Sequence, residues 1–274
     1  MDIRRRTLVI LAAVALAFVP AAFVPAAAQA PPVPGSIASM GDSITRGFNA
    51  CGFYIDCTSR SWSTGSSSSV NSHYLRIRAV NPSLVAYNDA RSGAKVADMP
   101  GQAQQAVSQG ADYVTVLIGA NDACTSSESS MTSTADFEAR FRTALQTLSA
   151  GIPDVAIFVS SIPDIKRLWD VGRNSSSART AWAALSICQS MLARPRSTDQ
   201  ADVDRRDRVR QRVADYNAIM SRVCAEQPQC RYDGGAVFSY PFQLSHLSTW
   251  DYFHPNTTGQ RLLAEITYPT GYGW

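Results

Sequence analysis

The chain has 274 residues, of which 45% are hydrophobic and 17% charged, and its formal net charge is +3. Three of the 25 basic residues and one of the 22 acidic residues lie in the first 30 positions, so the rest of the chain is close to neutral. This balance gives no basis for a nucleic-acid partner, and the composition is that of an ordinary soluble globular protein.

The first 30 residues have the pattern of a secretory signal peptide. A basic start, "MDIRRR", precedes an apolar run that ends in small residues, with Ala26 and Ala28 in the positions that signal peptidase prefers. Cleavage after Ala28 is favoured over cleavage after Ala30. A membrane anchor is the alternative, but prolines interrupt the run before it reaches the roughly 20 residues that span a bilayer. We expect residues 1–30 to be a signal peptide and residues 31–274 to be one secreted domain.

Short apolar runs alternate with helical patterns through the rest of the chain. The runs predict strands at Ser36–Met40, Ser83–Tyr87, Tyr113–Ile118 and Val155–Ser160. The helical patterns lie at Asn71–Val80, Met99–Gln109, Ala135–Ser149, Ala178–Met191, Asp204–Glu226 and Thr258–Tyr268. Near-continuous apolar strands separated by helices are typical of a parallel sheet that is covered on both faces. The sequence therefore predicts a three-layer α/β/α domain.

The six cysteines all follow the predicted leader, and an even number in a secreted chain indicates disulfides. The spacing favours two local pairs and one long closure, although sequence alone leaves other pairings open. By the chain-entropy argument the long closure would contribute most, about 4 kcal/mol. A zinc site is the alternative, but there is no CxxC motif and no histidine at ligand spacing. The favoured pairs are Cys51–Cys57, Cys124–Cys188 and Cys224–Cys230.

Ser43 lies on a tight corner directly after the first predicted strand, in "IASMGDSITRGF". Ligands of such folds bind at the carboxyl ends of the strands, where loops cross to the next helix. A serine at this corner has an accessible hydroxyl, and its amide can point at a developing oxyanion. A helix N-cap is the structural alternative. Asp42, next to it, is interpreted as fixing the loop.

A serine nucleophile needs a base, and the chain has three histidines to supply it. His73 falls in a predicted helix, where a surface or half-buried position is expected, and His246 has no evident partner. His254 follows Asp251 by three residues in "WDYFHPN". A carboxylate at that distance can accept a hydrogen bond from Nδ1 and leave Nε2 free to act as base. A structural histidine in a turn is the alternative.

Two further loops follow predicted strands and carry possible oxyanion donors. Gly93 lies in "NDARSGAKV", where its amide can approach a ligand, and Asn121 lies in "VLIGANDAC", where its side chain can donate. Taken singly, Gly93 could be a turn glycine and Asn121 a helix cap. Asp122, beside Asn121, is interpreted as fixing its loop.

The ordered blocks "GDSIT", "ARSGA", "GAND" and "DYFHP" resemble those of the SGNH hydrolases, also called GDSL esterases and lipases. They span residues 36 to about 260. The resemblance implies a flavodoxin-like α/β/α hydrolase with Ser43 as nucleophile, His254 as base and Asp251 orienting the base. It also implies an oxyanion hole of the Ser43 and Gly93 amides and the Asn121 side chain. In some members a backbone carbonyl replaces the aspartate, and here the carbonyl of Tyr252 could do so.

Within this family the chain resembles secreted actinobacterial members with phospholipase A1 or lipase activity, in "GDSITRGFNAC", "SSIPDIKRLW" and "FHPN". We therefore expect a secreted, monomeric carboxylic ester hydrolase that acts on lipid esters through an acyl-enzyme and needs no metal or organic cofactor. Its partners would be a small-molecule or lipid ester and, transiently, a lipid surface, but no nucleic acid. Candidate lipid contacts are Phe48, Phe53, Tyr54, Trp62 and Trp169.

Two other functions are open. A carbohydrate acetylesterase could use the same scaffold, and it would favour short acyl groups. An inactive binding protein of the cell envelope could retain the fold without the chemistry, and it would not react with a fluorophosphonate probe.

Overall fold

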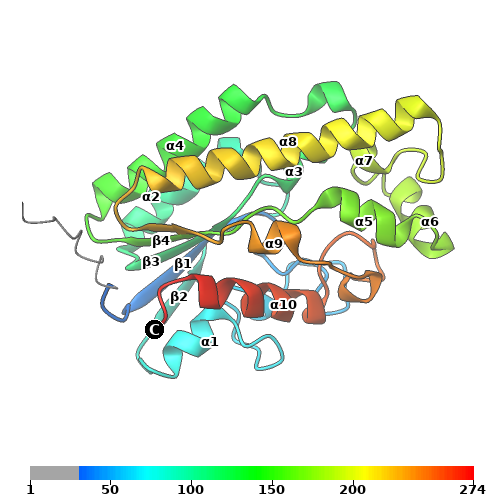
Figure 1. Cartoon of the computed structure of the whole chain (residues 1–274). Coiled ribbons are helices and arrows are strands. Elements are labelled where there is room, and N and C mark those ends of the chain that lie inside the picture. The colour runs from blue at the N-terminus through cyan, green and yellow to red at the C-terminus, as the bar shows by residue number, and fades with distance from the viewer. Residues whose placement is uncertain (1–30) are drawn as a thin grey trace, which may run out of the picture. The chain divides into compact units, whose positions relative to one another are not determined.

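The computed structural model describes residues 31–274, so the predicted signal peptide lies outside the described residues. Five parallel strands form one sheet in the order β2-β1-β3-β4-β5 (Figure 1). Strand β1 lies between β2 and β3. After β2 the chain therefore crosses to the other side of β1 and adds the remaining strands there. The strands are β1 (Ser36–Gly41), β2 (Val85–Asn88), β3 (Tyr113–Leu117), β4 (Ala156–Val159) and β5 (Cys230–Tyr232).

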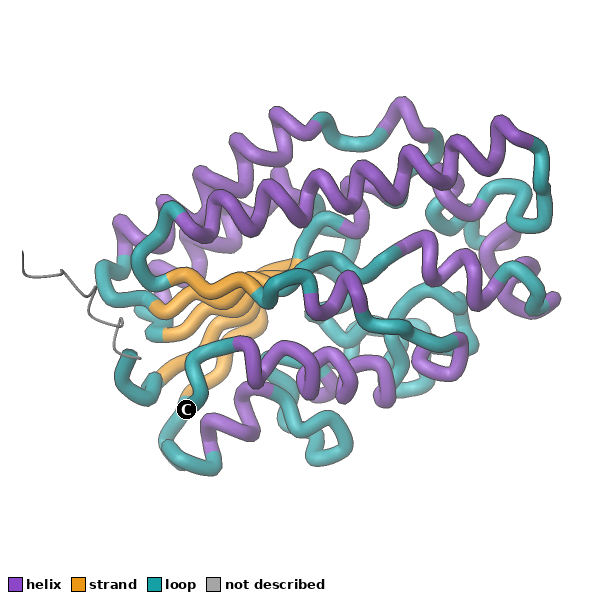
Figure 2. Tube along the Cα trace, viewed as in Figure 1, coloured by secondary structure: helices purple, strands orange, loops and turns teal. Residues whose placement is uncertain are grey.

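Helices cover both faces of the sheet, so the predicted three-layer α/β/α architecture is confirmed. Helices α2, α4 and α8 lie over one face, and α1 and α10 lie over the other (Figure 1), with the strands between the two helical layers (Figure 2). The helices are α1 (His73–Arg78), α2 (Met99–Gln109), α3 (Ala120–Ala123), α4 (Thr134–Gly151), α5 (Ile165–Gly172), α6 (Ser176–Ala184), α7 (Gln189–Leu192), α8 (Gln200–Ala225), α9 (Ala236–Ser239) and α10 (Thr257–Thr267).

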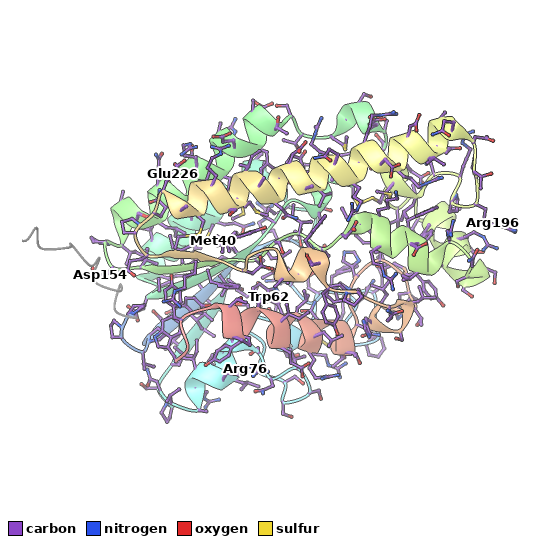
Figure 3. All side chains as sticks on the ribbon, in the orientation of Figure 1. Met40, Trp62, Arg76, Asp154, Arg196 and Glu226 are labelled. Carbon is purple, nitrogen blue, oxygen red and sulfur yellow. A yellow bond between two sulfur atoms is a disulfide. The ribbon has the colours of Figure 1, made fainter. Side chains whose placement is uncertain are left out.

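The central strands are buried on both faces, which explains their near-continuous apolar sequence. Every residue of β3, "YVTVL", is buried. On one side of the sheet, the rings of Phe137 in α4 and Tyr216 in α8 stack with centroids 4.1 Å apart. Figure 3 shows Met40 and Trp62 inside the packed side chains, whereas Arg196 lies at the periphery.

Some predicted elements differ from the observed ones. The single helix expected at Ala178–Met191 is wrong, because the chain breaks into α6 and α7. Ser186 and Cys188 between them have φ values of 49° and 44°, which a right-handed helix cannot contain. Strand β5 and helix α5 were not predicted, because β5 has only three residues and α5 only eight.

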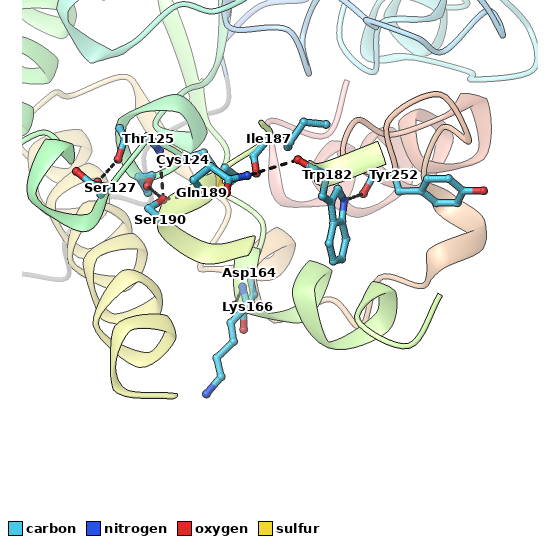
Figure 4. The surroundings of a disulfide bond; sticks show 12 residues. Cys124, Thr125, Ser127, Asp164, Lys166, Trp182, Ile187, Gln189, Ser190 and Tyr252 are labelled. Carbon is cyan, nitrogen blue, oxygen red and sulfur yellow. Dashed lines mark hydrogen bonds between the residues drawn. A yellow bond between two sulfur atoms is a disulfide. The ribbon is translucent and has the colours of Figure 1, made fainter. Parts of the chain in front are cut away.

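The six cysteines form the three pairs that their spacing favours, Cys51–Cys57, Cys124–Cys188 and Cys224–Cys230. The long closure joins the end of α3 to the turn between α6 and α7 (Figure 4). Beside it, the hydroxyl of Ser190 donates to the carbonyl of Ala123 at 2.7 Å. The start of α7 is therefore attached to α3, the short helix that carries Asn121. Among the described residues, none of the helices has the length and hydropathy needed to cross a bilayer.

Candidate active site

The loops after β1, β2 and β3 bring Ser43, Gly93 and Asn121 to one end of the sheet, around a common cavity. The corner before Ser43 requires glycine at position 41, because φ is +149° and a Cβ would collide with the carbonyl oxygen of Leu117 on the neighbouring strand. Gln102 in α2 holds the same glycine. Its Oε1 accepts from the Gly41 amide at 2.7 Å and its Nε2 donates to the Gly41 carbonyl at 2.9 Å.

Ser43, His254 and Asp251 form a continuous hydrogen-bonded chain. Oγ of Ser43 lies 2.8 Å from Nε2 of His254, and Nδ1 of His254 lies 2.6 Å from Oδ2 of Asp251. Ser43 is 6% exposed and Asp251 is 1% exposed, so water competes little for these contacts. The residues are 211 positions apart at their extremes, and the fold brings them together at the carboxyl ends of the strands.

The loop that carries His254 is fixed by its own hydrogen bonds. Leu247 and Pro255 pair in an isolated antiparallel bridge, and Oδ1 of Asp251 accepts from the amides of Phe253 and His254 at 2.9 and 3.1 Å. The carbonyl of Tyr252, the alternative partner for the imidazole, instead accepts from the indole of Trp182 at 3.0 Å (Figure 4). The carboxylate of Asp251 is therefore the group that contacts Nδ1.

Three hydrogen-bond donors line the cavity beside Oγ of Ser43. Within residues 31–274, no protein acceptor receives the amide N–H of Ser43 or of Gly93. Gly93 has φ of +82°, and nothing lies within 4 Å of a Cβ built on it, so its backbone conformation rather than space favours glycine. The side chain of Asn121 donates one hydrogen to the carbonyl of Ala94 at 2.9 Å, which leaves its second N–H for the cavity.

Two buried carboxylates flank these motifs and hold the loops. Oδ1 of Asp42 accepts from the amide of Ile44 at 2.9 Å, and Asp122 accepts from the Val96 amide at 2.9 Å and the Thr132 hydroxyl at 2.7 Å. Burial raises the pKa of Asp42 to about 7, partly offset by the Ile44 hydrogen bond and by the charge of His254. Burial also raises the pKa of Asp122. Both contacts fit the loop-fixing interpretation.

The cavity has a volume of about 280 Å³ and combines the polar groups with apolar walls. The rings of Phe48 and Phe253 pack edge-on against the imidazole of His254, with centroids 4.9 and 5.0 Å away. The complete lining is Ser43, Phe48, Tyr54, Ser92, Gly93, Asn121, Cys124, Ile187, Cys188, Asp251, Phe253 and His254.

A second, smaller pocket of about 60 Å³ shares Phe253 with this cavity. Its walls are mostly apolar and include Ile44, Ala120 and Leu263. Neither Ser43 nor His254 lines it, so the reactive groups face the larger cavity.

Several side chains lie elsewhere than the sequence suggested. The surface or half-buried position expected for His73 is wrong: the side chain is completely buried, and its ring nitrogens contact the hydroxyls of Tyr113 and Thr267 at 3.1 and 2.7 Å. Trp62 and Trp169 are 0% and 8% exposed, so they are unavailable for the lipid contact expected of them.

Sequence reasoning missed two supporting residues, Asn49 and Gln102. Nδ2 of Asn49 donates to Oδ2 of Asp251 at 2.6 Å, and Asn49 is 1% exposed. Its φ of 65° favours asparagine, but this preference is visible only once the backbone is known. Gln102 gave no signal either, because it lies in an amphipathic helix 61 residues from the glycine it holds.

The fold and the site define an α/β hydrolase with a serine beside a histidine. A family model described as GDSL-like lipase/acylhydrolase matches residues 37–267. The chain belongs to this family, which confirms the resemblance found in its four motifs. A search of curated protein sequences found no match to this chain.

Solved structures with the same fold are distant in sequence. An α/β hydrolase enzyme from the metagenome of Lake Arreo is 18% identical, with a TM-score of 0.54, over 86% of this chain and 94% of its own. A catalytic mutant of an acetylxylan esterase from Geobacillus stearothermophilus is 16% identical, with a TM-score of 0.54, over 86% and 93%. An extracellular lipase from Streptomyces rimosus is 17% identical, with a TM-score of 0.50, over 86% and 99%. At these identities the likeness establishes the fold.

Proposed function

We propose that this protein is a secreted ester hydrolase of the phospholipase A1 or lipase type, with Ser43 as nucleophile, His254 as base and Asp251 as the residue that orients the base. The observation that carries the proposal is the hydrogen-bonded chain from Oγ of Ser43 through the imidazole to Asp251, with contacts of 2.8 and 2.6 Å. A carboxylate on Nδ1 fixes the tautomer in which Nε2 accepts a proton, and it stabilises the imidazolium that follows.

The reaction would proceed in two halves. Oγ of Ser43 attacks the ester carbonyl while Nε2 of His254 takes the hydroxyl proton, and the new C–O bond places negative charge on the carbonyl oxygen. The amides of Ser43 and Gly93 and the side chain of Asn121 donate hydrogen bonds to that oxygen. Nε2 then gives the proton to the leaving alcohol as the C–O bond breaks. Water repeats these steps on the acyl-enzyme and releases the acid.

The apolar walls of the cavity support a lipid ester as the substrate. Phe48, Tyr54, Ile187 and Phe253 surround the serine and histidine, and an acyl chain would bury apolar surface against them. Secretion is supported by the three disulfides, since such bonds persist in oxidising compartments. The proposed organisation is a signal peptide over residues 1–30 followed by one hydrolase domain.

Product analysis with position-labelled phospholipids tests this proposal, with a series of short-chain esters beside them. The wild type is expected to release fatty acid from the sn-1 position, and Ser43→Ala is expected to release none. Release confined to acetyl esters, acetylated xylan among them, would replace the lipid substrate by a carbohydrate acetylester. If the wild type hydrolysed no ester and did not react with a fluorophosphonate, the protein would be a binding protein.

A further inference from the structure

Exposed large apolar side chains are concentrated beside the cavity. Eight such side chains occur within residues 31–274, and four of them lie on two segments next to the candidate active site. Phe53, Tyr54, Ile55 and Trp250, called the rim from here on, are 64%, 52%, 55% and 52% exposed. The three aromatic side chains among them alone expose on the order of 300 Å², because an aromatic side chain can bury about 150–250 Å². A patch of this size on a soluble protein is often functional.

The rim is continuous with the candidate active site. Tyr54 belongs to the rim and also lines the cavity. Its ring packs edge-on against Phe48 with centroids 5.0 Å apart, and Phe48 packs against His254 at 4.9 Å. Whatever the rim touches therefore lies at the mouth of the cavity that holds Ser43.

Several bonds hold the rim in place. The Cys51–Cys57 disulfide closes the loop, and the amide of Asn49 donates to the carbonyl of Ile55 at 3.0 Å. The indole of Trp250 donates to the carbonyl of Gly52 at 2.8 Å, which joins the two segments of the rim. Apolar side chains held outward by these bonds are already oriented for binding, so little conformational entropy is lost when they meet a partner.

The rim is uncharged. Residues 49–55, "NACGFYI", contain no ionisable group other than the Tyr54 phenol and the disulfide-bonded Cys51. The next residue, Asp56, forms an ion pair with Arg46 at 2.9 Å and accepts a hydrogen bond from Ser92. On the other segment Asp251 is buried against His254. An uncharged apolar patch fits the boundary between headgroups and acyl chains of a zwitterionic lipid, where Trp and Tyr side chains are favoured.

We propose that the rim is an interfacial anchor that inserts into the surface of zwitterionic phospholipid aggregates and holds the mouth of the cavity against them. This inference rests on the proposed lipid-ester function, and it identifies the part of the protein that would contact the lipid aggregate. A carbohydrate polymer is the competing occupant. It fits less well, because Phe53 and Ile55 offer no hydrogen bonds and the indole N–H of Trp250 is already donated to Gly52.

Vesicle binding tests the anchor separately from catalysis. Sedimentation with vesicles of a dialkyl ether phosphatidylcholine, which has no ester to cleave, measures partition of the whole protein. The double variant Phe53→Ser with Ile55→Ser is expected to bind at least about tenfold more weakly, because each substitution removes an apolar side chain from the lipid phase. The matched control, Val80→Ser with Val85→Ser, removes side chains that are 58% and 48% exposed away from the cavity, and it is expected to bind like the wild type.

Activity on a soluble butyrate ester separates loss of anchoring from loss of fold or of function. Neither Phe53 nor Ile55 lines the cavity, so the double variant is expected to keep this activity within about twofold. Vesicle binding without any ester hydrolysis would preserve the anchor and overturn the proposed function. The anchor would be overturned if the double variant bound vesicles as well as the wild type does, or if the wild type did not bind them at all. It would also be overturned if the rim were needed for binding to insoluble xylan and not to vesicles.

Quenching of tryptophan fluorescence by brominated phosphatidylcholine provides a second readout that does not depend on the double variant. Of the five tryptophans, Trp250 is the one in the rim; Trp62, Trp169 and Trp182 are buried, and the half-buried Trp274 packs against Tyr113 and Tyr272. The wild type is expected to be quenched on vesicles and Trp250→Phe to lose most of that quenching. Equal quenching of the two proteins would overturn the anchor.

Discussion

His254 and His73 are both hydrogen-bonded through both ring nitrogens, yet their surroundings suit them to different work. His254 lies between a carboxylate and a serine hydroxyl, and its side chain is 15% exposed at a cavity. His73 is fully buried between two hydroxyls and packs edge-on against the ring of Trp62, with centroids 5.2 Å apart. A histidine is suited to proton transfer by its partners and its access to substrate, and the number of its hydrogen bonds does not distinguish the two roles.

Removing each imidazole gives the largest expected contrast. His254→Gln is expected to lower kcat on a soluble ester by about 10⁴-fold or more, because within residues 31–274 no other base contacts Oγ of Ser43. His73→Gln is expected to change kcat by less than about threefold in protein that is folded. The measurement is steady-state hydrolysis of a p-nitrophenyl ester near neutral pH. If His254→Gln kept a tenth or more of the wild-type rate, His254 would not be the base.

His73 should instead determine acid stability. Burial, with a smaller contribution from nearby Arg76, lowers the pKa of His73 to about 3, against 6.5 for the free side chain. Below pH 6.5 the unfolded chain therefore binds a proton that the folded chain does not. The free energy of unfolding has its full value with respect to His73 above about pH 6.5, and it falls as the pH drops toward about 3. The lost free energy of unfolding would reach at most about 5 kcal/mol.

Urea denaturation between pH 3 and 8 measures this dependence. His73→Gln is expected to be less stable than the wild type at pH 8 but to lose less stability on acidification. The matched variant His254→Gln still contains His73, so its free energy of unfolding should depend on pH as that of the wild type does. A difference between wild type and His73→Gln that is constant across the range would contradict the burial of a neutral imidazole.

The oxyanion donor comes next in expected size. Asn121→Ala should lower kcat about 10²–10³-fold, because the amide would stabilise charge that exists only in the transition state. Asn81 is the matched control, since its side chain also donates to a backbone carbonyl, that of Pro34 at 2.8 Å, but it does not line the cavity. Asn81→Ala should leave kcat nearly unchanged. Equal losses in the two variants would mean that Asn121 acts only by holding its loop.

The smallest effect is expected at Asn49, which contacts Asp251 and not the substrate cavity. Asn49→Gly keeps the positive φ accessible and removes one hydrogen bond to the carboxylate. A hydrogen bond to a charged group contributes about 1.5–3 kcal/mol, so kcat should fall about 10–100-fold if this energy is used to orient His254. An unchanged kcat with lowered thermal stability would assign Asn49 to the fold alone.

The two histidines also show what sequence could and could not predict. The alternation of strands and helices predicted that Ser43, Gly93 and Asn121 would meet at one edge of the sheet, because parallel strands end together. His254 could be recognised from its spacing to Asp251. His73 could not be placed, because the groups that bury it, Tyr113 and Thr267, lie 40 and 194 residues away.

The break between α6 and α7 was missed for a similar reason. The local sequence there has the apolar spacing of one helix. The left-handed residues Ser186 and Cys188 and the disulfide to Cys124 impose a turn that local periodicity does not encode. Long-range constraints therefore account for the errors at His73 and at the break between α6 and α7, whereas β5 and α5 were missed because they are short.

Peptide mapping after reaction with a fluorophosphonate tests the central claim most directly. The wild type and His73→Gln are predicted to gain one adduct, on the peptide that contains Ser43, while His254→Gln reacts much more slowly and Ser43→Ala gains none. An adduct on another residue of the wild type, or labelling of Ser43→Ala at the wild-type rate, would contradict the assignment of Ser43 as the nucleophile.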